Sequence, residues 1–273
     1  MKRIVAIHDM SGYGKCSLTV ALPIISACGV EVCPLPTALL SSNTHFEGFT
    51  LLDFTPHMEA YIDHWGKLNL KVDAIYSGFL GSADQIDYIK KLHKKFLPQK
   101  VIIDPVMGDN GVIYKTYTPQ MCDRMRTLMD IADIVTPNLT EAATLVGEEY
   151  GETDTSCDGM KKLARKIKGL GAKSVVITGV ARGSKMYNCC MDEEYFEVCT
   201  DLLPCMHGTG DLFASVLTGG VMTGHSLQES VRSAAEFVHK IMKFTRTIEG
   251  GDERGACFEP FLYELQGGIF GGK

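Results

Sequence analysis

The 273-residue sequence predicts a doubly wound α/β fold, in which a mostly parallel central sheet is covered by helices on both faces. Short apolar segments rich in Val and Ile alternate with longer segments of helical periodicity. The short segments are apolar at consecutive positions, as is typical of parallel strands buried on both faces. A chain of this length commonly forms one α/β domain, so a single domain over residues 1–273 is expected, with a frayed tail at 266–273.

The expected elements follow from where each apolar pattern begins and ends. Parallel strands are expected at Ile4–Ile7, Val30–Cys33, Val72–Tyr76, Val101–Ile103, Ile131–Val135 and Val175–Thr178. Helices are expected at Ser17–Ala27, Asp84–Phe96, Cys157–Lys168, Gly210–Met222 and Leu227–Thr245. Gly169 and Gly171 mark the end of the third helix. The segments Ser184–Cys190 and Tyr195–Cys199 indicate an antiparallel hairpin at a sheet edge.

Composition excludes several classes of function. The net charge is -6 and no basic block is present, so we expect no nucleic-acid partner. No apolar run reaches the length of a membrane span, and the N-terminus lacks the pattern of a signal peptide. The ten cysteines are irregularly spaced without a Cys-x-x-Cys pair, which argues against a zinc site or a disulfide framework. A cytoplasmic protein with reduced thiols is therefore expected.

The most informative motif is Gly-Thr-Gly-Asp at 208–211. Glycines lack a Cβ and let backbone N–H groups converge. Apolar residues follow at helical spacing, so the motif is expected at a helix N-terminus, where free N–H groups favour an anion. Asp211 then falls in the first turn, where a carboxylate suits a base that deprotonates a hydroxyl attacking phosphorus. The alternative is a glycine turn in which Asp211 serves as a helix cap.

Polar residues also follow each predicted strand: Asp9, Thr37 with Ser41–Thr44, Ser77–Gly78, Asp104–Asp109, Thr136–Glu141 and Thr178–Gly179. The carboxyl ends of parallel strands share one edge of a sheet, so these residues are expected to gather there. Any one of them could serve a structural purpose. Asn138 with Glu141, for example, also fits a capping box at a helix start.

These motifs together resemble a known family. Gly208-Thr209-Gly210-Asp211 looks like the C-terminal signature of the ribokinase-like superfamily. Asp104-Pro105-Val106-Met107-Gly108-Asp109, with Gly111 and Tyr114, is similar to its vitamin-kinase branch. Thr136-Pro137-Asn138-x-x-Glu141 and Val176-Ile177-Thr178 complete the pattern. Across nearly the whole chain, order and spacing most closely resemble the pyridoxal (pyridoxine, pyridoxamine) kinases.

The resemblance implies ATP-dependent phosphorylation of the 5′-hydroxymethyl group of a vitamin B6 vitamer, a small heteroaromatic alcohol. It makes Asp211 the catalytic base at the substrate, and it lets the amides of Gly208, Thr209 and Gly210 stabilise the transferring phosphoryl group. The ATP-binding residues that it implies are Asp104, Asn138, Thr178, Gly179, Gly208 and Gly210. The family is often a homodimer, and the apolar helix Leu18–Ala27 could line such an interface or belong to the core.

The resemblance also implies bound cations and a lid. Mg²⁺, which prefers carboxylates, water and phosphate oxygens, would be organised by Asp104, Thr136 and Glu141. A monovalent cation such as K⁺ or Na⁺ could be held by Asp104, Thr136 and Thr178. A flap over the nucleotide and the substrate would be formed by Met107, Gly108, Asp109, Gly111 and Tyr114.

The substrate ring would contact Asp9, Thr44 and Phe79. Two of these positions depart from better-known members of the family, where Ser is common in place of Asp9 and Tyr in place of Phe79. We hypothesise that Asp9 accepts a hydrogen bond from a protonated ring nitrogen or an amino substituent, which would favour pyridoxamine or a pyrimidine amine. The alternative is that Asp9 caps the following helix.

Other interpretations remain open. A hydroxymethylpyrimidine (phosphate) kinase shares these motifs, although its usual signature has Cys where this chain has Asp211. A non-catalytic sensor of vitamin B6 or nucleotide would need neither Asp211 nor Glu141. The segment Gly12–Ser17 suggests a phosphate-binding P-loop, but Asp9 and Cys16 break that pattern, so a glycine turn beside the substrate is expected. Cys205 could approach an aldehyde substrate or a bound nucleotide, but a buried structural thiol is expected.

Overall fold

The computed structural model describes residues 1–115 and 117–267. The strands of the main sheet are β1 (Arg3–Ser11), β2 (Glu31–Leu40), β3 (Leu51–Asp53), β4 (Ala74–Ser77), β5 (Lys100–Ile103), β8 (Ile134–Val135), β9 (Ser174–Arg182), β10 (Lys185–Met191) and β11 (Tyr195–Asp201). A separate two-stranded hairpin consists of β6 (Gly108–Asp109) and β7 (Val112–Ile113).

The helices are α1 (Leu18–Ala27), α2 (Thr55–Lys67), α3 (Ala83–Phe96), α4 (Pro119–Arg126), α5 (Leu139–Val146), α6 (Cys157–Lys168), α7 (Thr209–Met222), α8 (Leu227–Thr245), α9 (Gly251–Arg254) and α10 (Leu262–Gly267). Short 3-10 turns occur at Met129–Ile131, Tyr150–Glu152 and Glu259–Phe261. Among the described residues, no helix is long and apolar enough to cross a lipid bilayer.

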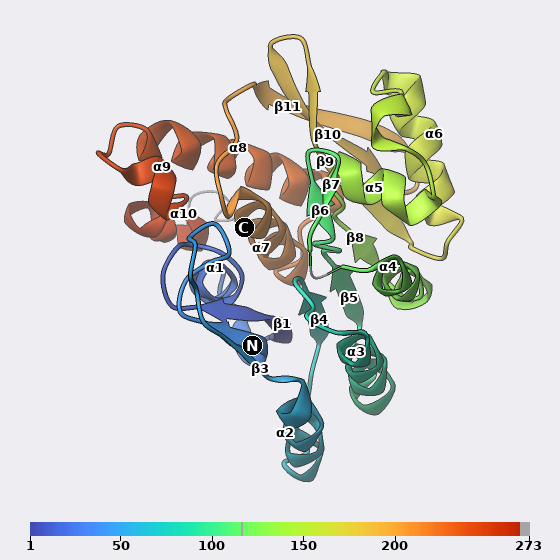
Figure 1. Cartoon of the computed structure of the whole chain (residues 1–273), viewed down its shortest axis with the longest axis vertical. Helices are drawn as coiled ribbons and strands as arrows, with labels where there is room; N and C mark the ends of the chain where they lie inside the picture. Colours follow the sequence, from blue (N-terminus) through green and yellow to red (C-terminus); the bar gives the residue numbers. More distant parts are fainter. Residues whose placement is uncertain (116, 268–273) are drawn as a thin grey trace.

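The strand order in the main sheet is β11-β10-β9-β8-β5-β4-β1-β2-β3 (Figure 1). The six strands from β9 to β2 pair in parallel, whereas β3, β10 and β11 are antiparallel to their neighbours. The predicted α/β fold, with its six parallel strands and its edge hairpin, is thereby confirmed. The parallel strands bring their carboxyl ends to one edge, which is where polar residues are expected to gather.

Each face of the sheet carries its own apolar core. Alternate residues point to opposite faces, so Val5 and Ile75 pack on one side while Ile4 and Tyr76 pack on the other. The first core includes side chains from helices α2 to α6, and the second includes side chains from α1, α7 and α8. Figure 1 shows the same division, with α1, α7 and α8 on one side of the strands and α3 to α6 on the other.

Several strands are longer than predicted, which corrects the placement of three residues. Asp9, Thr37 and Thr178 lie inside β1, β2 and β9 rather than after them. The β1–β2 ladder continues past a register shift between His8 and Met10, and Asp9 and Thr37 lie at that shift, where the regular pairing is interrupted. In contrast, the predicted strand Ile131–Val135 shortens, because Met129–Ile131 forms a 3-10 turn.

Two other expectations differ from the structure. The helices α2 and α4 were not predicted; α2 buries only Met58 and Ile62, so its apolar signal is weak. Residues 266 and 267 belong to α10 and are not a frayed tail, whereas 268–273 lie outside the described residues.

The helices α1 and α7 approach closely because Gly219 has no side chain. A Cβ at Gly219 would lie 2.4 Å from Sγ and 2.7 Å from Cβ of Cys28, the C-cap residue of α1. Distances this short force one helix to move. The position of α7, which carries Asp211, therefore depends on this contact.

We expect Gly219→Ala to lower the free energy of unfolding by about 1–3 kcal/mol, because the added methyl group overpacks the α1–α7 contact. The measurement is denaturant unfolding. Gly151→Ala is the matched control, since a Cβ there would meet nothing within 4 Å. Adding Cys28→Ala to Gly219→Ala should recover part of the loss. Equal stability of the Gly219 and Gly151 variants would contradict the expectation.

Candidate active site

The predicted polar residues do meet at one edge of the sheet. Backbone hydrogen bonds join successive strand ends across this edge: Gly78 N–H to Ile7, Asp104 N–H to Ser77, Thr136 N–H to Ile103 and Thr178 N–H to Pro137, all at 2.8–3.0 Å. Asn138 and Thr178 also form an isolated parallel bridge. The start of α7 and the hairpin β6–β7 belong to the same region of the molecule (Figure 1).

The Gly-Thr-Gly-Asp motif lies at the N-terminus of α7, as predicted. Gly208 is the N-cap, with a left-handed φ of 76°, and a Cβ there would lie 2.0 Å from the carbonyl oxygen of Lys15. Both facts restrict this position to glycine. The Thr209 hydroxyl donates to the Met206 carbonyl at 2.9 Å and fixes the turn. The first amides of α7 have no partners within the helix, so they remain available to an anion.

Asp211 occupies the first turn of α7, and its side chain is 15% exposed. Burial raises its pKa to about 7; the charge of Asp9 also raises it, while a hydrogen bond from the Ser17 backbone N–H opposes the shift. A carboxyl group with this pKa exchanges protons readily near neutral pH, which is the property of a general base.

Asp9 is buried and binds two hydroxyl groups. Its carboxylate accepts hydrogen bonds from Ser17 Oγ at 2.5 Å and from Ser11 Oγ at 3.0 Å. Burial raises its pKa despite these bonds. Ser17 is the N-cap residue of α1, so Asp9 holds the residue before the helix by its hydroxyl group. Cys16 lies close by: burial, and then the charges of Asp211 and Asp9, raise its pKa to about 12.

Asn138 and Glu141 form the capping box of α5, which is the structural role expected for them as an alternative. Asn138 Oδ1 accepts from the Glu141 N–H at 3.0 Å, and Glu141 accepts from the N–H groups of Asn138 at 2.9 Å and Met107 at 3.0 Å. Asn138 Nδ2 donates to the Gly108 carbonyl at 2.8 Å. The same side chains therefore cap α5 and fasten the base of the hairpin β6–β7.

Asp104 and Glu141 are buried acids at this edge. Burial raises the pKa of both carboxyl groups, and the charges of Glu141 and Asp211 raise that of Asp104 further. The Thr136 hydroxyl is also buried, and it has no hydrogen-bond partner among the described residues. These are hard oxygen donors lacking a positive partner, so they fit Mg²⁺ that reaches them with phosphate and water. Among the described residues, no three His, Cys, Asp or Glu side chains form a metal cluster by themselves.

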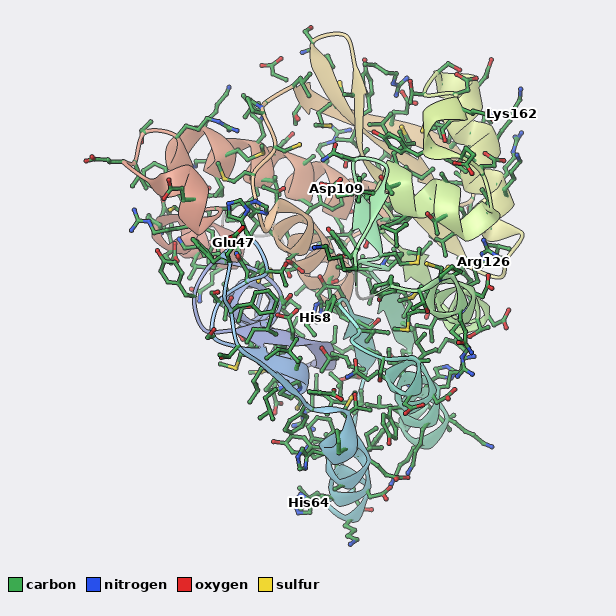
Figure 2. All side chains as sticks on the ribbon, in the orientation of Figure 1. His8, Glu47, His64, Asp109, Arg126 and Lys162 are labelled. Carbon is green, nitrogen blue, oxygen red and sulfur yellow. The ribbon has the colours of Figure 1, made fainter. Side chains whose placement is uncertain are left out.

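The expected flap is the hairpin β6–β7 with the residues around it. The Gly111 N–H donates to Thr140 Oγ1 at 2.8 Å, and the Tyr114 N–H donates to the Met107 carbonyl at 2.9 Å. Gly108 is needed here, since a Cβ would lie 2.5 Å from the Val112 carbonyl oxygen. The flap is thus anchored on α5 at its base while Asp109 is exposed on the hairpin (Figure 2).

The three predicted substrate residues lie in different settings. Phe79 is half-buried directly after β4, and its carbonyl accepts from Thr37 Oγ1 at 3.0 Å. Asp9 is bound to serine hydroxyls, as described above. Thr44 is exposed in the loop 41–50, whose neighbouring residue His45 packs its ring 4.1 Å from that of His207. Figure 2 places Glu47 of this loop and Asp109 of the flap above His8 in the view.

Sequence analysis missed three residues at this site. His8 lies beside Asp211, with its Nδ1 4.0 Å from Asp211 Oδ1. Cys16 and Ser17 lie directly before α1, and both are close enough to Asp211 to interact with it. The only signal for His8 is a basic ring in a strand of Val, Ala and Ile. The sequence signals at Ser17 and Cys16 were a P-loop pattern and, for Ser17, the start of a helix. Cys205, in contrast, is exposed and not buried as expected.

Comparison with known proteins finds a matching family and similar chains. The family described as Phosphomethylpyrimidine kinase matches residues 22–257. The pyridoxine kinase of Bacillus subtilis is 33% identical over 180 residues, and the match spans 63% of this chain and 64% of that protein. The chain thus matches less than two thirds of that relative's length.

Two solved structures are similar over most of the chain. A Bacteroides thetaiotaomicron protein assigned to the phosphomethylpyrimidine kinases, crystallised with pyridoxal, is 38% identical with a TM-score of 0.92, covering 97% of this chain and 95% of that one. The pyridoxal kinase of Staphylococcus aureus in complex with AMP-PCP and pyridoxal is 25% identical with a TM-score of 0.77, covering 89% and 88%.

The raised pKa of Asp211 predicts how stability depends on pH. The folded protein keeps this proton up to about pH 7, whereas an ordinary aspartate loses it near 3.8. The carboxyl group therefore contributes stability that is complete below about pH 4 and is lost as the pH rises through about 7. We expect the melting temperature of the wild type, relative to Asp211→Asn, to fall between about pH 4 and pH 7 and to level off above that range.

The control for this comparison is Glu236→Gln, which neutralises an exposed acid on α8. Its melting temperature should follow that of the wild type across the same range. A constant difference between wild type and Asp211→Asn would contradict the assignment of a buried, proton-holding carboxyl group.

Proposed function

Since this chain belongs to the phosphomethylpyrimidine kinase family, we propose that it transfers the γ-phosphoryl group of ATP to the 5′-hydroxymethyl group of a vitamin B6 vitamer. The observation that carries the proposal is the position of Asp211, in the first turn of α7 beside amides that can bind an anion. The pyridoxine kinase relative and the two neighbours crystallised with pyridoxal support vitamin B6 as the substrate.

Asp211 would act as the general base. Its carboxylate takes the proton of the substrate hydroxyl while that oxygen forms a bond to the γ-phosphorus and the bond from phosphorus to the ADP oxygen breaks. The backbone amides of Gly208, Thr209 and Gly210 would face the transferring oxygens and stabilise their charge. A pKa near 7 keeps a useful fraction of Asp211 ionised at neutral pH.

The phosphates of ATP would lie across the edge formed by Asn138, Thr178 and Gly179. Thr178 and Asn138 are adjacent through the isolated bridge, and Gly179 is exposed with a φ of 70°. This proposal gives Asn138 two tasks, because its amide also holds the Gly108 carbonyl of the flap. Nucleotide binding and flap position would then be linked through one side chain.

Asp104, Thr136 and Glu141 are the residues that would hold Mg²⁺ brought with ATP. When bound there, Mg²⁺ supplies charge neutralisation for the phosphate oxygens. The carboxylates suit such a cation, since burial raises the pKa of both and the charges of Glu141 and Asp211 raise that of Asp104 further. Asp104 and Thr136, with Thr178, would also suit a monovalent cation such as K⁺ or Na⁺.

The flap would exclude water from the reacting centre. Met107, which was expected to belong to the flap, is instead buried in the core directly before the hairpin, while Val112 and Tyr114 are exposed hydrophobic residues on and beside it. A ligand below the flap would give these apolar groups a partner and keep water from competing as the phosphoryl acceptor.

Hydroxymethylpyrimidine, or its phosphate, is the second candidate substrate. The description of the matching family favours it, because that description names a phosphomethylpyrimidine kinase. Asp211, where the thiamin branch usually carries Cys, favours the vitamin B6 substrate instead.

The first experiment measures ADP release from Mg-ATP with pyridoxal, pyridoxine, pyridoxamine and hydroxymethylpyrimidine in parallel. We expect turnover on at least one B6 vitamer, with Asp211→Asn lowering kcat by about 10²-fold or more because the base is lost. ADP binding should persist in this variant, which shows that it is folded. Turnover on the pyrimidine alone would assign the enzyme to thiamin metabolism, and ligand binding without turnover would indicate a sensor.

The role of Asp9 predicts a change in vitamer preference. If Asp9 accepts a hydrogen bond from the amino group, Asp9→Ser should lower kcat/KM for pyridoxamine relative to pyridoxal by about tenfold, as expected for a lost charged hydrogen bond. If Asp9 binds the protonated ring nitrogen, which both vitamers carry, kcat/KM should fall for both. The measurement is kcat/KM for each vitamer, and unchanged values for both would leave Asp9 with its bonds to Ser11 and Ser17 alone.

A further inference from the structure

His8 is a buried ring beside the proposed base. Its side chain is fully buried in β1, and Nδ1 lies 4.0 Å from Oδ1 of Asp211. Its ring packs edge-on against that of Tyr76 in β4, with centroids 4.3 Å apart and an interplanar angle of 66°. The His8 ring, which projects from β1, therefore contacts β4 and the first turn of α7.

Neither ring nitrogen of His8 has a hydrogen-bond partner among the described residues. Leaving buried polar atoms unpaired costs free energy, and native proteins keep few such atoms. A phenylalanine would fill the same space without that cost. The position of the imidazole next to Asp211 therefore needs a reason beyond packing.

Gly78 determines how close the His8 ring comes to Asp211. A Cβ at Gly78 would lie 2.1 Å from Nδ1 and 2.4 Å from Cε1 of His8. The absence of a side chain at Gly78 leaves room for the edge of the ring that carries Nδ1. Because Gly78 lies outside the left-handed region of φ, this close contact is the evident reason for glycine here.

We propose that His8 is a positioning residue for Asp211: its neutral imidazole donates the Nδ1 hydrogen to the Asp211 carboxylate and orients that carboxylate toward the substrate hydroxyl. The separation of 4.0 Å is slightly longer than a hydrogen bond, so a small rotation of the carboxylate completes the contact. This inference rests on the proposed function of Asp211 as the base.

Neutrality suits this role. Burial lowers the pKa of His8 to about 3, so the ring is uncharged at neutral pH. A cation at this place would hold the proton off Asp211 too strongly for it to act as a base near pH 7, whereas a neutral donor orients the carboxylate and leaves it basic. The other ionisable groups around the pair are Asp9, Cys16, Tyr76, Asp104 and Tyr114, and none of these is a cation.

The kinetic test compares His8→Phe with His8→Gln in the ADP-release assay. Phenylalanine keeps a ring and removes the donor, whereas glutamine restores an N–H. We expect His8→Phe to lower kcat by about 10- to 100-fold, the scale of a misplaced catalytic group, with KM for ATP nearly unchanged. Glutamine should recover part of kcat. The proposal is overturned if His8→Phe keeps kcat within about twofold of wild type, or if glutamine is no better than phenylalanine.

Two further variants separate positioning from general damage to the core. Gly78→Ala retains the imidazole but displaces it, so it should also lower kcat; normal kcat in this variant would contradict the proposal. Thr218→Val is the matched control, because it removes a buried, unpartnered hydroxyl from the same helix as Asp211 without changing the volume much. Its kcat should equal that of wild type. Gly78→Ala also decides the question if His8→Phe fails to fold.

A measurement without turnover distinguishes failure of this inference from failure of the proposed function. In ¹⁵N NMR spectra of the whole protein, the His8 ring is identified by its loss in His8→Gln. We expect a neutral ring protonated on Nδ1, whose resonance moves in Asp211→Ala. A ring protonated on Nε2 alone, or no response to Asp211→Ala, would overturn the proposal. If the wild type phosphorylates no alcohol, the proposed function fails and this spectrum still decides the His8–Asp211 contact.

Discussion

The burial of acidic side chains at one edge of the sheet is the constraint on which the site depends. Asp9, Asp104 and Glu141 are buried there, Asp211 is largely so, and no buried lysine or arginine occurs among the described residues. Burial raises the pKa of all four carboxyl groups. Hydrogen bonds within the fold offset part of the free energy that burying these carboxylates costs. Serine hydroxyls donate to Asp9, and backbone amides donate to Glu141. A ligand that carries positive charge, as nucleotide-bound Mg²⁺ would, could offset the remaining cost of burying these carboxylates.

Two close contacts with the backbone shape this edge of the sheet, and each of them requires a glycine, Gly208 in one case and Gly78 in the other. Gly208 brings the start of α7 against the carbonyl of Lys15, so the loop before α1 and the anion-binding turn are in contact. Gly78, directly after β4, has no side chain and so leaves room for the His8 ring of β1. The two contacts place Ser17 and His8 around Asp211 from different elements. Asp211, the proposed base, is thus positioned by tertiary packing, although the motif that contains it is local.

The sequence predicted those parts of the molecule that local patterns determine. The bounds of α6 and α8 agree with the structure because capping serines and wide apolar faces define them, and the capping box at Asn138 was recognisable for the same reason. The helix α2 was missed because it covers the sheet with two buried side chains. The strand β2 was cut short at Cys33 because Pro34 and Pro36 follow; β3 pairs only with residues 38–40, so these prolines have no strand on that side. His8 escaped notice because its partner, Asp211, is more than two hundred residues away in sequence.

The two sides of the site are held by different kinds of contact, and this difference bears on specificity. On the side proposed for the nucleotide, Asn138 and Glu141 bind each other in a capping box, and the same two side chains hold the base of the flap. On the side proposed for the alcohol, the loop 41–50 is held by contacts between distant elements, such as the Asn43 N–H to the Tyr13 carbonyl and the ring contact of His45 with His207. A substitution in that loop can reshape the alcohol site without disturbing the capping box. The proposed phosphoryl transfer would therefore stay constant while the accepted alcohol changes, and for this reason the motifs indicate a kinase more firmly than they indicate its substrate.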